Sequence, residues 1–473
     1  MRKAKLFAFR VLIVFAFAGS RLAVAQDEAT SPQLPDVQSF AAAPANTFRP
    51  QGTIVLPASS VARPEDAGVR AHTTHMIFVP QGHSMSSPTP SYTFAETPAS
   101  LACVYKVGPS FAGCNPLSGS TTHASGGWGA IALVDAYDNP NAAADLTYFS
   151  SHWGLPAANF TKVYANSSYG TLGGLSASCS GVPAGDTGWG LEEDLDIEYA
   201  HAMAPSAKII LVEACSNSYN DLLFAEEVAG KVVAAAGGGD ISNSWIGGES
   251  PSQLGVAGFD NHFYRNYWQH ITYFASSGDY GFGVGYPSTN PWVVSAGGTT
   301  INRDSAGNYL SESCWAGSGG GNSTVETWAN PPNSIYNGMG TWADYQYKLF
   351  GGYPYGTAPR STPDISADAD PASGAWVYDS YGYSGWVVVG GTSLASPLLA
   401  GIVNTSNNRL GQAPSNGGYY HTGELDLLYG QLYSKTAYAA NFYDVKTGSN
   451  GVSAVAGYDQ CTGIGSPRGK LGK

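Results

Sequence analysis

The chain has 473 residues, of which 12% are charged and 43% are hydrophobic, and its formal net charge at pH 7 is −13. These values predict a compact globular protein and exclude a disordered chain, because there is ample apolar material for a core. Lysine and arginine form no cluster beyond the first ten residues, which argues against nucleic acid as a partner. Since the negative charge falls as carboxylates become protonated, the composition suits acidic surroundings.

The N-terminus has the features of a secretory signal peptide over residues 1–25. Basic residues precede an apolar run that ends at Ala18, and Ala-Val-Ala at residues 23–25 has the small side chains of a cleavage site. The apolar run is short and is soon followed by Arg21, which favours a cleaved signal over the alternative of an uncleaved membrane anchor, and no later segment could cross a bilayer. We therefore expect a secreted protein, extracellular or periplasmic, with no membrane contact after cleavage.

Residues 26–96 are rich in Ala, Pro, Ser and Thr and have no sustained period of 2 or 3.6 residues. This composition predicts a tether or a small leader, with no full-size pro-domain evident. Ordered character begins near Thr97, so the main domain is expected over residues 97–473.

Six cysteines follow the signal peptide, an even number that suits an oxidising compartment. Cys103 and Cys114 are predicted to form a disulfide, because a short loop closes at little entropic cost. The pairing of the other four, Cys179, Cys215, Cys314 and Cys461, stays open.

From residue 130 onward, apolar runs of strand length alternate with longer amphipathic stretches. Alternation of this kind predicts an α/β fold with a mainly parallel central sheet and helices on both faces, and it places ligands beyond the carboxyl ends of the strands. The expected strands are Ala130–Val134, Lys208–Val212, Ile241–Trp245, Ile271–Ala275 and Trp292–Ala296, and the expected helices are Ala142–Trp153, Glu192–Met203 and Asn220–Ala236.

Glu192 and Asp196 are four residues apart in an acidic segment, so a helix places them on one face, one turn apart. If that face is partly buried, the two carboxyl groups share a proton, and the pair can act as both acid and base. The structural alternative is a solvated acidic helix start, because acidic residues favour that end of a helix.

Two further aspartates follow predicted strands. Asp279 lies between glycine and tyrosine after Ile271–Ala275, and a protonated carboxyl group there could donate to a developing oxyanion. Asp135 follows the first strand, and we expect it to be an outer carboxylate partner of Glu192. For each of them the alternative is an ordinary turn residue.

Ser393 stands where a predicted strand, Trp386–Val389, gives way to a predicted helix, Leu394–Val403. Such a turn exposes a hydroxyl beside the free N–H groups of a helix start, which suits a nucleophile next to an oxyanion site. The alternative is a serine that only caps the helix. No histidine offers an obvious base for this serine, since His201 near a helix end is better explained structurally.

The C-terminal region holds Asp444 and Asp459 in glycine-rich loops. Two carboxylates with close backbone carbonyls suit a hard cation, although the twelve-residue order of an EF-hand is missing and a plain loop is the alternative.

Together these segments resemble the sedolisins, or serine-carboxyl peptidases, over residues 97–469. The motifs are Glu192 and Asp196 in E-E-D-L-D-I-E, Asp279 in S-S-G-D-Y-G, Ser393 in G-G-T-S-L-A-S-P, and residues 363–371 as P-D-I-S-A-D-A-D-P. The resemblance implies a subtilisin-like three-layer fold.

By this resemblance, Ser393 is the nucleophile, Glu192 the general base and then acid, and Asp196 its orienting partner. Asp279 becomes the oxyanion donor, together with the Ser393 backbone N–H. Glu193 stands where the family often has tryptophan, and the short leader departs from the family's large pro-domain, which puts self-cleavage in doubt.

The resemblance also implies one structural calcium ion near the C-terminus. Its ligands would be the side chains of Asp444 and Asp459 and the carbonyl groups of Val445, Val455 and Gly457. A glycine is common in the family where Val455 stands, but a carbonyl ligand survives that change.

These features predict a secreted, monomeric serine-type endopeptidase with an acidic pH optimum, which cleaves peptides or unfolded protein through an acyl-enzyme. One alternative is a noncatalytic peptide- or glycan-binding protein that keeps the peptidase fold. Another is a Ser-His-Asp subtilisin that uses Asp135 and has an optimum near pH 8.

Overall fold

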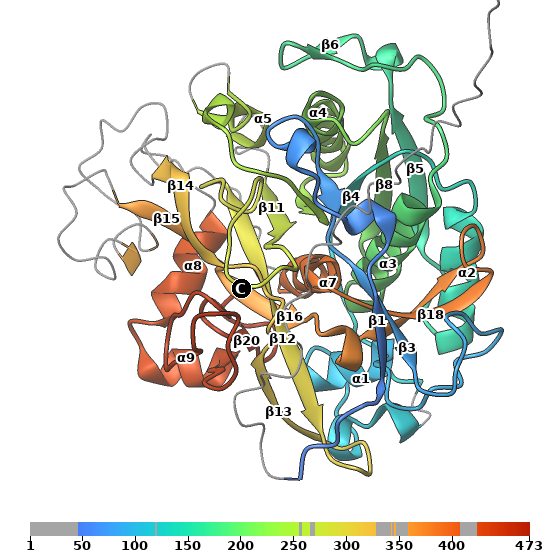
Figure 1. Cartoon of the computed structure of the whole chain (residues 1–473), viewed down its shortest axis with the longest axis vertical. Helices are drawn as coiled ribbons and strands as arrows, with labels where there is room; N and C mark the ends of the chain where they lie inside the picture. Colours follow the sequence, from blue (N-terminus) through green and yellow to red (C-terminus); the bar gives the residue numbers. More distant parts are fainter. Residues whose placement is uncertain are drawn as a thin grey trace, which may run out of the picture. The chain divides into compact units, whose positions relative to one another are not determined.

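An eight-stranded sheet lies at the centre of the computed structural model (Figure 1). The structure describes residues 46–118, 121–254, 258–264, 270–327, 342, 345–346, 358–406 and 423–473. The strand order is β13-β12-β11-β9-β4-β8-β5, and β16 pairs with β12. All pairings in this sheet are parallel except that of β12 with β13. The strands are β4 Ala130–Ala136, β5 Asn159–Ala165, β8 Lys208–Ala214, β9 Gly239–Asn243, β11 Ile271–Ser276, β12 Val293–Arg303, β13 Tyr309–Cys314 and β16 Ile365–Asp368.

Helices cover both faces of this sheet, because its strands are apolar on both sides. Along β4, Ile131 and Leu133 face a core shared with α3 and α7, while Ala132 and Val134 face a second core shared with α4. This is the predicted three-layer α/β architecture. The helices are α1 Pro98–Val104, α2 Ala142–Trp153, α3 Thr187–Met203, α4 Tyr219–Ala235, α5 Asn261–Tyr264, α7 Thr392–Asn404, α8 Gly423–Gln431 and α9 Lys435–Asn441.

A second, antiparallel sheet has the order β1-β3-β18-β17, formed by Gly52–Val55, Met76–Pro80, Gly385–Gly390 and Ala375–Asp379. The expectation of a tether or leader before Thr97 is therefore corrected for this segment, whose strands β1 and β3 are part of the folded body. The physical reason is that β3 is a short apolar run stabilised by backbone pairing with β18, a partner more than 300 residues away, which leaves no local periodicity.

Short strands complete the described structure. β2 pairs with β10, β6 with β7, β14 with β15, and β19 with β20. Their bounds are β2 His72–Thr73, β10 Trp245–Ile246, β6 Thr171–Leu172, β7 Leu175–Ser176, β14 Gly321–Thr327, β15 Pro359–Thr362, β19 Phe442–Tyr443 and β20 Ser466–Pro467. The expected strand Ile241–Trp245 is divided, because β9 ends at Asn243 and Trp245 pairs with Thr73.

Three disulfides join cysteines in the described part of the chain: Cys103–Cys114, Cys179–Cys215 and Cys314–Cys461. The predicted pair Cys103–Cys114 is confirmed. The other two span 36 and 147 residues, separations that sequence alone cannot match to partners.

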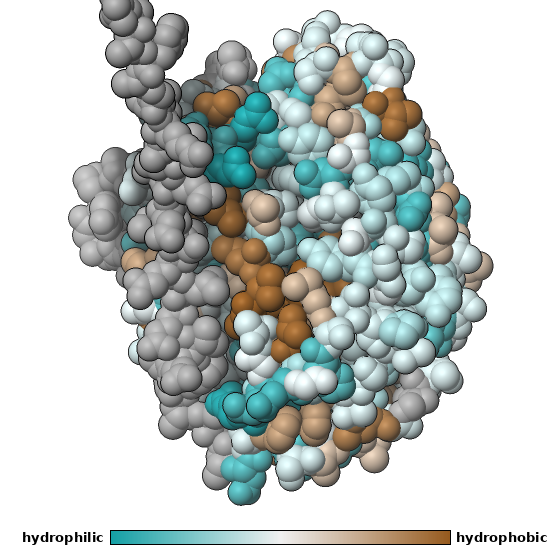
Figure 2. All heavy atoms as spheres, turned by 45° about the vertical axis from the view of Figure 1, so that its right-hand side comes forward, coloured by the Kyte–Doolittle hydropathy of each residue, from teal (hydrophilic) through white to brown (hydrophobic). Residues whose placement is uncertain are grey.

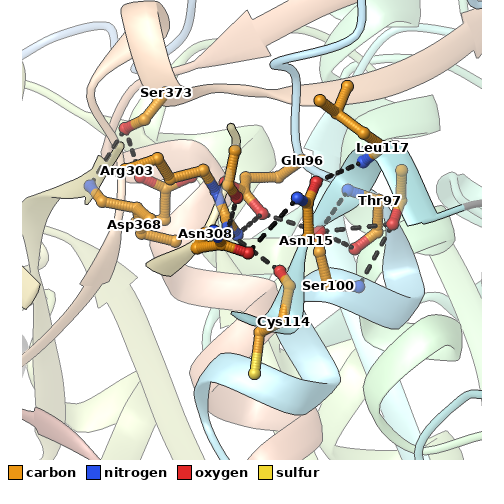
Figure 3. A network of polar contacts seen from close by, with 12 residues as sticks. Glu96, Thr97, Ser100, Cys114, Asn115, Leu117, Arg303, Asn308, Asp368 and Ser373 are labelled. Atoms are coloured by element: carbon orange, nitrogen blue, oxygen red, sulfur yellow. Dashed lines mark hydrogen bonds and ion pairs between the residues drawn. The ribbon is translucent and has the colours of Figure 1, made fainter. Parts of the chain in front are cut away.

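A buried ion pair fixes the chain immediately before α1. Arg303, on β12, donates from Nε to Glu96 Oε1 at 2.6 Å and from Nη2 to Glu96 Oε2 at 2.7 Å, a bidentate geometry (Figure 3). Ser100 Oγ donates to the same carboxylate at 2.6 Å, and Arg303 Nη1 also reaches the Cys114 carbonyl at 2.9 Å. The network therefore ties α1 and the first disulfide to the central sheet.

Figure 2 shows a band of apolar residues in the middle of one face, smaller separate apolar patches near its edges, and a surface that is otherwise mostly pale to hydrophilic. Among the helices of the described residues, none combines the length and the apolar character needed to cross a bilayer. The predicted signal peptide, residues 1–25, and the start of the predicted leader lie outside the described residues.

Candidate active site

Ser393 lies in the first turn of α7, directly after β18 and the single linking residue Gly391. The predicted strand-to-helix turn is therefore present. Gly391 has φ +106°, and a Cβ there would lie 2.3 Å from the Thr74 carbonyl oxygen and 2.5 Å from Asp279 Oδ2, so only glycine fits. The Ser393 hydroxyl is buried, 2.8 Å from Thr74 Oγ1 and 3.3 Å from the Ser244 carbonyl oxygen.

The helix α3 brings Glu192 and Asp196 into this buried region. Every residue of α3 from Trp189 to Met203 is buried, and both carboxyl groups have no exposed surface. The alternative of a solvated acidic helix start is thus excluded. Ser244 connects the two elements, because its Oγ donates to Asp196 Oδ1 at 2.7 Å while its carbonyl accepts from Ser393.

Glu192 makes its short contact with a residue that the sequence analysis did not single out. His75 Nδ1 and Glu192 Oε2 share a hydrogen bond of 2.7 Å, and both side chains are fully buried. Burial lowers the pKa of His75 to about 3, so its imidazole is neutral and a poor proton acceptor.

Burial also governs the ionisation of the carboxyl groups. Desolvation raises the pKa values of Glu192, Asp196 and Asp135 well above the usual range. The charge of Glu192 raises the pKa of Asp135, and the charges of Asp135 and Glu192 raise that of Asp196, while the Ser393 hydroxyl opposes the rise at Glu192. The titration of each of these groups therefore depends on the charge of its neighbours, which is the condition for the shared proton expected of Glu192 and Asp196.

Asp279 follows β11 and reaches the opposite side of the Ser393 turn. Its Oδ1 accepts from the Thr392 backbone N–H at 2.8 Å and from the Thr392 hydroxyl at 2.7 Å, while Oδ2 has no hydrogen-bond partner among the described residues. Burial raises the pKa of Asp279 to about 8, against the effect of these two bonds. Below that pH the carboxyl group is protonated and its Oδ2 can act as a donor.

Asp135 sits at the end of β4 with both oxygens buried and without partners in the described part of the chain. Its electrostatic coupling to Glu192 and Asp196 is consistent with the expected role as an outer carboxylate. Glu193 points elsewhere, because its Oε2 accepts from the Asn139 backbone N–H at 3.1 Å.

Sequence reasoning did not identify Thr74 and His75 as part of this region. The register of β3 on β18 pairs Met76 with Gly390, so the residues before Met76 run alongside the residues after Gly390. A histidine in a segment without periodicity carries no local signal of this placement.

The predicted calcium ligands lie in one loop region near the C-terminus. Asp444 Oδ1 accepts from the Gly457 N–H at 2.9 Å, and Asp459 Oδ2 accepts from the Val455 N–H at 2.9 Å. The loop 455–457 is thus held between the two carboxylates, whose oxygens are of the kind that a hard cation takes as ligands. No cluster of three or more His, Cys, Asp or Glu side chains suited to a metal occurs among the described residues, so a cation here would depend on carbonyl ligands such as that of Val445.

Known proteins were compared with the whole chain. It is 29% identical to kumamolisin from Bacillus sp. (strain MN-32) over 369 residues, which are 72% of this chain and 58% of that protein. It is 27% identical to sedolisin from Pseudomonas sp. (strain 101) over 345 residues, which are 68% of this chain and 53% of that protein. The chain thus spans somewhat more than half the length of these relatives, and no protein-family model matches it.

A solved structure, Pseudomonas sedolisin complexed with two molecules of pseudo-iodotyrostatin, has a TM-score of 0.54 against this chain. The match covers 80% of this chain and 96% of the other at 23% identity, a similarity that concerns the fold. The chain is therefore similar to the sedolisins in sequence and in fold.

Proposed function

We propose that the protein is a serine-carboxyl endopeptidase that hydrolyses peptide bonds through an acyl-enzyme on Ser393. One observation supports the proposal above all. The buried Ser393 lies in the same region as three buried carboxyl groups whose pKa values are raised, those of Glu192, Asp196 and Asp279. A cluster of ionisable side chains with shifted pKa values around one hydroxyl group is typical of catalytic sites.

In this proposal, Glu192 accepts the Ser393 proton as the hydroxyl attacks the substrate carbonyl, and then donates it to the leaving amine. Asp196 supplies the second carboxyl group of the pair that it forms with Glu192. The Ser244 Oγ fixes the position of Asp196 by donating to its Oδ1 at 2.7 Å. The Ser393 backbone N–H and protonated Asp279 stabilise the oxyanion. Because Glu192 and Asp196 work with a shared proton, activity is highest in acid and falls as that proton is lost.

Two alternatives lead to different expectations. A noncatalytic peptide- or glycan-binding protein would keep this fold without turnover. A histidine-dependent subtilisin would place an imidazole of ordinary basicity on the serine, whereas His75 contacts Glu192 and burial lowers its pKa to about 3. The buried carboxyl groups therefore favour the serine-carboxyl mechanism.

The test compares Ser393→Ala with Ser396→Ala, a matched control on the same buried helix whose hydroxyl contacts Ser242 instead. With a denatured protein substrate at about pH 4, Ser393→Ala is expected to lose at least about 10³-fold in kcat/KM, and Ser396→Ala to stay near the parent value. Turnover by Ser393→Ala at the parent rate would contradict the nucleophile, and a parent without turnover would favour the binding protein.

We further propose a secreted monomer that acts on peptides or unfolded protein, with neither nucleic acid nor membrane as a partner. The three disulfides support passage through an oxidising compartment. A calcium ion held by Asp444, Asp459 and the carbonyls of Val445, Val455 and Gly457 would supply positive charge that stabilises the C-terminal loops.

A further inference from the structure

Beside the candidate active site lies a second pair of buried carboxyl groups, those of Glu193 and Glu213. Glu193 follows Glu192 on α3, and Glu213 on β8 is in register with Asp135 on the neighbouring strand β4. None of these four residues has exposed surface. Because water cannot stabilise a charge there, the protonation of each carboxyl group depends on its neighbours.

The two carboxyl groups of the Glu193–Glu213 pair meet at a single hydrogen-bond donor. The Asn139 backbone N–H donates to Glu193 Oε2 at 3.1 Å and to Glu213 Oε1 at 3.3 Å. One donor between two carboxylates does not offset their mutual repulsion, so the pair retains a proton. Desolvation, followed by the charges of Glu213 and Asp135, raises the pKa of Glu193 well above its usual range.

The outer end of the pair contacts a cation near the surface. Lys162 Nζ lies 2.8 Å from Glu213 Oε1 and 3.0 Å from Asp138 Oδ1, and the side chains of Lys162 and Asp138 are 16% and 12% exposed. Burial raises the pKa of Glu213 to about 8, and the charge of Lys162 opposes that rise. Glu213 is therefore the first member of the pair to ionise. Tyr164, whose ring lies beside Lys162, keeps its proton, because burial raises its pKa.

The inner end of the pair adjoins Asp135, which links it to the catalytic carboxyl groups. Besides desolvation, the charge of Asp135 raises the pKa values of Glu193 and Asp196. The charge of Glu192 likewise raises the pKa of Asp135. The repulsion between two charges acts on both partners alike, so a negative charge on the pair opposes the ionisation of Asp135 in turn.

A matched control residue lies on the same helix. Glu198 is also fully buried, and its Oε2 accepts from the Tyr378 backbone N–H at 3.2 Å. Besides desolvation, the charges that raise its pKa are those of Asp194, Asp145 and Asp379. The catalytic carboxyl groups are not among them, so a change at Glu198 alters a buried carboxyl group of α3 without altering the pair. Asp194 is unsuitable as a control, because the charge of Lys162 also acts on it.

We propose that the Glu193–Glu213 pair acts through Asp135 to hold the shared proton on the catalytic carboxyl groups. Glu193 and Glu213 are thus positioning residues. The inference rests on the proposed function and deepens it by naming what sets the upper end of the pH range of activity. As the pH rises, Glu213 gives its proton to water, and the pair then carries one negative charge beside Asp135. Because like charges in a buried region oppose further ionisation, Glu192 and Asp196 keep their proton to a higher pH.

The experiment measures kcat/KM for cleavage of a denatured protein over a pH series, with Glu193→Gln, Glu213→Gln and the double variant. Each single variant keeps one carboxyl group that takes up the charge, so the upper limb of its pH profile should not move to lower pH. The double variant loses the charge but keeps side-chain oxygens that accept from Asn139. Its upper limb should move at least about half a pH unit lower, while kcat/KM in acid stays within about two-fold of the parent.

Glu198→Gln should keep the upper limb of the parent. A double variant with the limb of the parent, or one whose limb moves no further than that of Glu198→Gln, overturns the inference and leaves the proposed function standing. A parent without turnover overturns both. Repeating the series on Asp279→Asn removes the titration of Asp279 from the limb, and the same shift is expected there.

A second variant covers the case in which the double variant does not fold. Glu193→Gln is then combined with Glu213→Met and Lys162→Met, because apolar side chains that replace a buried ion pair often leave the fold as stable as before. The charge of the pair is again absent, so the upper limb should again move at least about half a pH unit lower. A limb at the position of the parent overturns the inference.

Discussion

The backbone N–H of Ser393 donates to the carbonyl oxygen of Thr74 at 2.9 Å, although the two residues are 319 positions apart in the chain. The contact follows from strand register, because β3 pairs with β18 immediately before β18 turns into α7. The same sheet thus positions both Ser393 and the segment that contains Thr74.

Substitutions of Asp279 test the proposed oxyanion site. Asp279→Ala removes the Oδ2 donor, so kcat is expected to fall by about 10²- to 10³-fold. Asp279→Asn keeps an Oδ1 that can accept from Thr392 and adds an N–H donor, so it should retain most of the activity. Its activity should also extend to higher pH, because the amide does not titrate. Steady-state kinetics over a pH series measure both effects, and equal losses in the two variants would argue against a donor role.

Stability is expected to be greater at about pH 4 than at about pH 8. Burial raises the pKa of Asp279 from 3.8 to about 8, so between these values the folded protein holds a proton that the unfolded chain has lost. The free energy of unfolding therefore falls as pH rises through this window and levels off above it. Asp135, Glu192 and Asp196, whose pKa values are also raised by burial, act in the same direction.

Urea unfolding of Ser393→Ala at a series of pH values measures this slope without self-cleavage. Adding Asp279→Asn to that background should make the slope shallower, because one of the titrating groups is gone. Stability that rises with pH across the window would contradict the protonated, buried state of these carboxyl groups.

The buried pair of Glu96 and Arg303 should contribute strongly to stability. Glu96→Gln leaves the guanidinium, whose side chain is 5% exposed, without its counter-charge, so we expect a loss of about 3–5 kcal/mol in the free energy of unfolding. The exposed pair of Arg70 and Asp66, 3.9 Å apart, provides the control, and Asp66→Asn should cost no more than about 1 kcal/mol. Chemical denaturation compares the two, and similar losses would contradict the distinction.

Removal of calcium should destabilise the C-terminal loops. A chelator is expected to lower the melting temperature, and added Ca²⁺ to restore it, because a bound ion stabilises only the folded state. Asp444→Asn should weaken this response by removing one ligand charge while its Oδ1 can still accept from Gly457. A melting temperature that does not respond to chelator or Ca²⁺ would leave these loops as glycine-rich turns without a cation.

Local sequence patterns predicted several features of the candidate site. A four-residue spacing fixes Glu192 and Asp196 on one helical face whatever surrounds the helix, and a glycine before Thr392 and Ser393 marks the turn from β18 to α7. The strands of the central sheet were predicted because each is an apolar run that must be buried on both faces.

Other features have no local signal. β1 and β3 lie in the stretch that was expected to be a tether or a small leader, since their pairing depends on a distant strand and their few residues show no period. His75 was not predicted to be part of the site for the same reason. The pairing of four cysteines likewise depends on which loops the fold brings together.

The sequence by itself determined the α/β architecture, the residues that carry the proposed chemistry and the resemblance to the sedolisins, because these depend on composition, short-range spacing and motif order. Tertiary structure alone decided that the acidic face of α3 is buried, and that the segment around Thr74 lies against Ser393. Burial and strand register arise from contacts between segments hundreds of residues apart, and such contacts leave no trace in local periodicity.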